Sequence, residues 1–99
     1  MGPMADCAYD AKPVLGNPAW TPRQGDICTD NEVTIIRLPQ AQPMQREPAL
    51  FVLDGDKNEV VTVRQRGRQY QVSRPIARAE LRHFEGGMAE VVRIDRVSE

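Results

Sequence analysis

The closely spaced arginines are the residues of this chain best suited, by type and spacing, to bind anionic groups. The stretch from Arg64 to Arg82 contains six arginines and one acidic residue, Glu80, so its net charge is +5. Each guanidinium is a planar, permanently charged fork of N–H donors that suits phosphate groups and stacks on bases. We therefore predict a surface that contacts the phosphates of RNA or DNA. Its members are Arg64, Arg66, Arg68, Arg74, Arg78 and Arg82.

The charge of the whole chain limits this hypothesis. The 99 residues hold 13 basic and 14 acidic side chains, a net charge of −1, and Lys12 and Lys57 are the only lysines. This balance excludes a diffuse polycation but permits a local basic surface between acidic ends. Two alternatives stay open. The arginines form a solvated charged face, or they steer an acidic protein partner toward the chain.

The other reactive residue types form no catalytic or metal-binding pattern. His83 is the only histidine, so a catalytic triad or a zinc site would depend on it alone. Cys7 and Cys28 are too few for a disulfide scaffold. They could pair with each other, but we favour two reduced thiols, as in a cytosolic protein. The sequence thus predicts no catalytic residue, no metal and no cofactor.

Hydropathy argues against a membrane protein. No apolar run approaches the roughly 18 residues of a membrane span. No basic start precedes an apolar stretch, as it does in a secretory signal. We expect a cytoplasmic protein with no membrane partner.

The first quarter of the chain differs in composition from the rest. Residues 1–24 contain four prolines, and only two of the chain's large aliphatic residues, Val14 and Leu15, precede Ile27. Proline fixes φ and removes a backbone donor. We predict an extended N-terminal arm over 1–24 and a small β domain over 25–99. Trp20 in this arm is expected either to pack on the domain edge or to anchor a partner.

Most of the domain reads as short strands separated by turn residues. The predicted strands are 27–29, 32–38, 49–53, 59–65, one through Tyr70 and Val72, and 89–97. A two-residue turn at Arg66 and Gly67 would place Val63 opposite Tyr70. The apolar side chains then share one face, while Thr62, Arg64, Gln69 and Gln71 share the other. Tyr70 joins Trp20 as a candidate partner-binding aromatic.

The segment 74–84 has two interpretations. Its Ala, Glu, Leu and Arg content favours a short helix over 75–84 that ends at Gly86. A strand that turns at residues 86–87 would instead pair Leu81 with Val92 and Arg78 with Asp95. We favour the helix. The predicted fold is therefore mainly β, a small antiparallel barrel or sandwich of five to six strands with one short helix.

Two resemblances follow from these residues. The run over about residues 24–97 resembles Src-homology-three-like small barrels in architecture. Residues 24–27 (QGDI) and 46–53 (REPALFVL) look like the opening of messenger-RNA interferase toxins, although Glu47 interrupts the Arg-Pro step of that family. The second resemblance implies ribonuclease activity, but no later segment matches the family's catalytic hydroxyl residue.

Three functions remain as hypotheses. The leading one is a non-catalytic binding module that contacts nucleic acid through residues 64–82. The second is a protein-interaction or assembly module that binds an acidic protein surface or associates with itself, through a sheet edge or the N-terminal arm. The third is a ribonuclease toxin of the interferase type.

Overall fold

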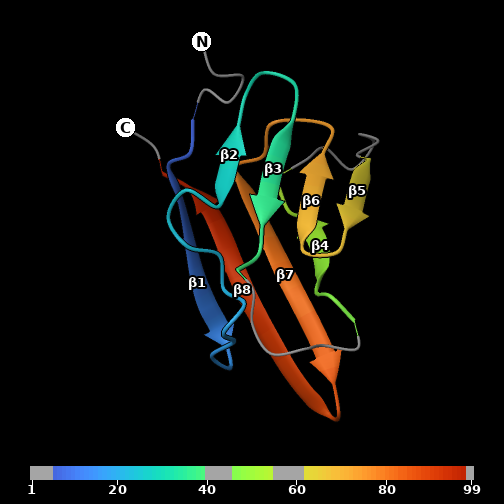
Figure 1. Ribbon diagram of the computed structural model, residues 1–99. Coiled ribbons are helices and arrows are strands. Elements are labelled where there is room, and N and C mark those ends of the chain that lie inside the picture. Colours follow the sequence, from blue (N-terminus) through green and yellow to red (C-terminus); the bar gives the residue numbers. More distant parts are fainter. Residues whose placement is uncertain (1–5, 40–45, 55–61, 98–99) are drawn as a thin grey trace.

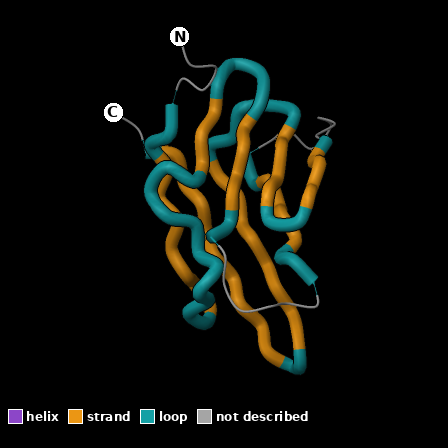
Figure 2. The backbone as a smooth tube through the Cα atoms, viewed as in Figure 1, coloured by secondary structure: helices purple, strands orange, loops and turns teal. Residues whose placement is uncertain are grey.

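The chain folds into two antiparallel β-sheets packed face to face. The computed structural model describes residues 6–39, 46–54 and 62–97, and these residues form strands and loops without a helix (Figure 2). The strands are β1 (Tyr9–Leu15), β2 (Ile27–Thr29), β3 (Thr34–Arg37), β4 (Ala49–Val52), β5 (Val63–Arg66), β6 (Gln69–Val72), β7 (Arg78–Glu85) and β8 (Met88–Arg96).

Each sheet has four strands. The front sheet has the order β2-β3-β6-β5, and the back sheet has the order β1-β8-β7-β4 (Figure 1). The prediction of a mainly β domain is confirmed in its sandwich form. No closed barrel is found among the described residues, and more strands are present than the five or six expected. No helix in the described ranges is long and apolar enough to cross a membrane.

Alternation along the strands builds the core. In β6, Tyr70 and Val72 are fully buried, whereas Gln69 and Gln71 are exposed. The inward side chains of both sheets meet in one cluster, as expected when side chains alternate with a period of two. This cluster consists of Trp20, Ile27, Ile36, Leu38, Tyr70, Val72, Ile76, Ala79, Leu81, Val92 and Ile94.

The favoured helix over 75–84 is wrong, and the strand alternative is confirmed. β7 pairs with β8 in the register expected for the strand, with Leu81 opposite Val92 and Arg78 opposite Asp95. Leu81 is fully buried against the front sheet. Pairing with β8 and burial of one face outweigh the modest helix propensity of these residues.

The β5–β6 hairpin turns one residue later than predicted. Val63 lies opposite Val72 and Gln65 opposite Tyr70, so the turn residues are Gly67 and Arg68. Gly67 has a φ of 55°, which favours glycine at the first position of the turn. Because the register shifts by two residues, the predicted faces are preserved. The predicted strand residues 59–61 and nearly all of the predicted loop over 54–58 lie outside the described residues.

Residues 6–24 contribute to both sheets. Asp6 forms an antiparallel bridge with Thr29 of β2, and β1 then pairs with β8 at the edge of the back sheet. Pro13 lies within this edge strand, where a missing N–H donor is tolerated. Trp20 is 3% exposed and belongs to the core. The segment predicted as an arm therefore supplies an edge strand and a core side chain.

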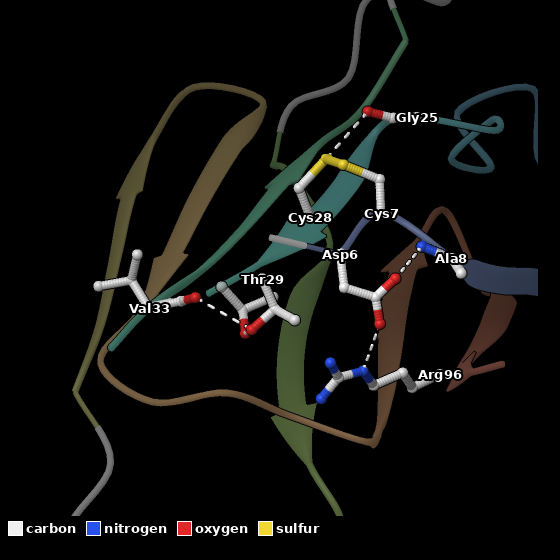
Figure 3. The surroundings of a disulfide bond; sticks show 9 residues. Asp6, Cys7, Ala8, Gly25, Cys28, Thr29, Val33 and Arg96 are labelled. Carbon is white, nitrogen blue, oxygen red and sulfur yellow. Dashed lines mark hydrogen bonds and ion pairs between the residues drawn. A yellow bond between two sulfur atoms is a disulfide. The ribbon is translucent and has the colours of Figure 1, made fainter. Parts of the chain in front are cut away.

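A disulfide joins this segment to the front sheet, so the prediction of two reduced thiols is wrong. Cys7 bonds to Cys28 of β2. Beside the bond, the Asp6 carboxylate accepts hydrogen bonds from the Ala8 N–H at 2.8 Å and from Arg96 Nε at 2.7 Å (Figure 3). The Asp6–Thr29 bridge brings the two cysteines together although 21 positions separate them in the sequence. Spacing alone does not reveal that bridge.

Two side chains hold the crossing from β6 to β7 between the sheets. The buried hydroxyl of Thr34 donates to the Arg74 carbonyl at 2.9 Å and accepts from the Ile76 N–H at 3.2 Å. Asp54 accepts from the Ala77 N–H at 2.7 Å. These bonds satisfy backbone groups that the sheets leave unpaired, and they fix where the chain changes sheet.

We expect reduction of the Cys7–Cys28 disulfide to destabilise the protein. Closing a loop of this length stabilises a fold by about 3 kcal/mol through the entropy of the unfolded chain. Urea unfolding with and without a reductant measures the difference. The double variant C7S/C28S should match the reduced protein and be insensitive to reductant. Free thiols titrated in the purified, unreduced protein would contradict the bond.

Candidate functional site

The structure distributes the six predicted arginines over both sides of the sandwich. Arg64 and Arg66 lie on the outer face of the front sheet, and Arg68 occupies the turn that follows. Arg78 and Arg82 alternate with the buried Ala79 and Leu81. They therefore lie on the outer face of the back sheet. Arg74 lies in the crossing between the sheets.

Three of these arginines form ion pairs with carboxylates. The N–O distances are 3.4 Å for Arg74–Asp54, 3.3 Å for Arg78–Asp95 and 2.8 Å for Arg82–Glu80. The Arg82 guanidinium also lies over the Phe51 ring, 4.1 Å from its centroid. These charges are already partly compensated within the fold.

Arg68 has a structural role in the turn. Its carbonyl accepts a hydrogen bond from the Leu38 N–H at 2.8 Å, which links the turn to the end of β3. Its Nε atom is buried and has no hydrogen-bond partner among the described residues. Arg68 is therefore less available to a ligand than the exposed Arg64 and Arg66.

Neither predicted partner-binding aromatic offers its ring to a partner. Tyr70 is fully buried, and its hydroxyl donates to the Pro48 carbonyl. Burial raises the pKa of Tyr70, and the nearby charge of Glu47 raises it further. Trp20 packs in the core, edge-on to the His83 ring at 6.1 Å between centroids. Both aromatics position the sheets from inside.

The front sheet presents a basic face that includes one arginine not predicted. Arg37 of β3 lies opposite Gln69, and Gln69 lies opposite Arg66 on the other side. In the next row of this face, Gln71 lies beside Arg64. We call this set the front face: Arg37, Arg64, Arg66, Gln69 and Gln71. The alternation of residues 34–37 carries the signal for Arg37, because Thr34 and Ile36 are apolar or small and point inward.

Charge is segregated between the two sheets. The front strands contain no acidic residue, and their charged residues are Arg37, Arg64 and Arg66. The back strands contain five basic and five acidic residues, so their charges cancel. Among the described residues, no carboxylate forms an ion pair with any of the three front-face arginines.

The front face is shallowly hollowed along β5 and β6. One hollow of about 300 Å³ is lined by Arg64, Arg66, Gln69 and Gln71. A second hollow of about 330 Å³ shares Arg64 and Gln71 and extends toward Thr62 and Ser73. Guanidinium and amide groups therefore line two neighbouring hollows on this face.

Metal-ligating groups are not assembled in the described part of the chain. His83 lies between two carboxylates, with Nε2 3.0 Å from Glu85 and Nδ1 3.2 Å from Glu90. No group of three or more His, Cys, Asp or Glu side chains in the described ranges could hold a metal ion. The two segments that resemble interferase toxins fall in different sheets, since Ile27 begins β2 and residues 49–52 form β4.

No protein-family model matches this chain, and no curated protein matches it either. The resemblances to Src-homology-three-like barrels and to interferase toxins stay predictions from the sequence.

On the outer face of the back sheet, Glu80 forms ion pairs with Arg82 and Arg93, and their contribution to stability depends on pH. Hydrogen bonds from Arg93 Nη2 at 2.9 Å and Arg82 Nη2 at 2.8 Å hold the pKa of Glu80 below its ordinary value of 4.5. A lowered pKa in the folded state stabilises the fold above about pH 4.5. This contribution is lost as the pH falls through the folded pKa.

We therefore expect Glu80→Gln to lower the free energy of unfolding at pH 7 by about 1 kcal/mol. This value is below the roughly 1.5 to 3 kcal/mol of a hydrogen bond to a charged group, because the arginine side chains are 35% and 48% exposed. The difference should shrink in urea unfolding at pH 3. The control Asp95→Asn removes a more exposed pair and should change little. An equal loss at both pH values would argue against the ion pairs of Glu80 as its cause.

Proposed function

We propose that this chain is a non-catalytic binding module whose front face contacts nucleic-acid phosphates. The segregation of charge between the sheets carries the proposal. A solvated charged surface normally mixes both signs, as the back sheet does. The front sheet holds three arginines and no acid in its described strands.

The backbone spaces these arginines as a fixed set of donors. Arg64 and Arg66 are two residues apart on one strand, which separates their Cα atoms by about 7 Å. Arg66 and Arg37 flank β6 in one row, about 10 Å apart across two strand spacings. Gln69 and Gln71 lie between them and add amide donors, which also bind phosphate oxygens. A polyanion with repeated phosphates can engage several of these groups together.

The strength of binding should depend steeply on salt. Neutralising three phosphates releases their counterions, so affinity should fall about 20- to 40-fold between 50 and 200 mM salt. Fluorescence anisotropy with labelled RNA and DNA measures this slope. No binding to either nucleic acid at low salt would overturn the proposal.

Single arginine variants locate the contact. Arg37→Ala, Arg64→Ala and Arg66→Ala should each weaken binding and reduce the magnitude of the salt slope by about one phosphate. Arg78→Ala is the matched control, because it removes the same charge from the opposite face. If Arg78→Ala weakens binding as much as Arg64→Ala, net charge rather than the front face governs binding.

A second candidate function is self-association at the end of the back sheet. β1 is an edge strand, and its Val14 and Leu15 are 52% and 50% exposed. Phe84 and Met88, near the β7–β8 turn, are 64% and 68% exposed. An edge strand with exposed apolar side chains favours pairing with a second copy.

Size-exclusion chromatography with light scattering tests this candidate. We expect a dimer at high protein concentration and a monomer for the Leu15→Asp variant, because a charge on the edge blocks pairing. A wild-type monomer at every concentration would contradict it.

The Cys7–Cys28 disulfide bears on the cellular compartment in which the protein works. The cytoplasmic prediction depends on reduced thiols, whereas the structure joins Cys7 to Cys28. Disulfides persist in oxidising environments and are rare in the cytosol. The disulfide therefore weighs against a cytoplasmic location.

A further inference from the structure

The front face has no exposed aromatic side chain, and this limits the class of nucleic acid that it can bind. The outward residues of its described strands are arginine, glutamine, isoleucine and cysteine. The only aromatic residue of these strands is Tyr70, which points into the core and is fully buried. Proteins that bind single strands stack the bases on exposed aromatic rings. The front face provides no such ring.

Exposed aromatic rings occur on the other sheet. Phe84 is 64% exposed near the β7–β8 turn, and Phe51 is 40% exposed on β4. The Arg82 guanidinium already covers the Phe51 ring. A strand bound to the front-face arginines therefore cannot stack on these rings from the same surface, because the two faces lie on opposite sides of the sandwich (Figure 1).

The shape of the front face also disfavours reading of base edges. Readout in the major groove needs a helix or a two-stranded ribbon that enters it. Here four short strands lie side by side, and the hollows along β5 and β6 are shallow. The long arginine side chains can reach phosphates on the outside of a helix, but the backbone behind them is too broad to enter a groove.

Preorganisation then favours a duplex over a single strand. The arginines are held on β3 and β5, the two strands that flank β6, so their anchor points are fixed before binding. A duplex also holds its phosphates in place, whereas a flexible single strand must be ordered at an entropic cost. In single-strand binders, stacking of the bases on aromatic rings offsets that cost. The front face has no aromatic ring on which bases could stack.

We infer that the front face binds double-stranded nucleic acid through its phosphates, with little preference for base sequence. This inference rests on the proposed function and adds to it the class of substrate. Glutamine amides and arginine forks bind the same phosphate oxygens in DNA and RNA, so both duplexes share the required chemistry.

A competition between strand forms tests the inference. Full-length protein is titrated into two unrelated DNA duplexes of about 20 base pairs, an RNA duplex, and single-stranded oligo-dT of equal length. We expect both DNA duplexes to bind within about twofold of each other, and oligo-dT to bind at least tenfold more weakly. The duplex salt slope should be about −2.7 for three phosphates, and Arg64→Ala should lower its magnitude by about 0.9. The RNA arm shows which duplex geometry fits better.

The failures of the two proposals are distinguishable. Tighter or equal binding of oligo-dT would overturn the duplex inference and leave the proposed function intact. A tenfold difference between the two DNA duplexes would show base readout and would also overturn it. No binding of any strand form at low salt would overturn both. Duplex binding that is unchanged in the triple variant R37A/R64A/R66A would place the contact elsewhere.

Discussion

The burial of Tyr70 is the constraint on which the front face depends. Its ring fills the space between the sheets, and its hydroxyl donates to the Pro48 carbonyl, so β6 has a single orientation. Because side chains alternate, Gln69 and Gln71 must then point outward. The registers of β3 and β5 against β6 place Arg37 and Arg66 beside Gln69. One buried ring thus determines which polar groups share the solvent-exposed face.

The two sheets differ in how their charges are compensated. The back sheet balances its charges internally, and its outer face is held by ion pairs such as those of Glu80 with Arg82 and Arg93. The front sheet leaves its arginines without carboxylate partners among the described residues. Thr34 and the Cys7–Cys28 disulfide connect the front sheet to the crossing and to the N-terminal segment. We interpret the back sheet as the scaffold and the front sheet as the binding surface.

The sequence predicted the local pattern better than the long-range arrangement. The strand at 27–29 followed from the turn residues on either side of it, and the inward and outward faces around Tyr70 followed from alternation. Both are local properties. The choice of helix for 75–84 failed because propensity does not include the pairing partner β8. The pairing of Cys7 with Cys28 and the burial of Trp20 depend on contacts between distant segments. The arginine block was a sequence cluster that the crossing at Arg74 divides between two faces.

The central claim is that nucleic acid contacts the front face and not the back face. Two-dimensional NMR of labelled protein titrated with a DNA duplex tests it residue by residue. The account predicts shifts concentrated at Arg37, Arg64, Arg66 and their neighbours on β6, with Arg78 and Arg82 on β7 unchanged. Shifts concentrated on β7 and β8, or spread evenly over both sheets, would contradict it.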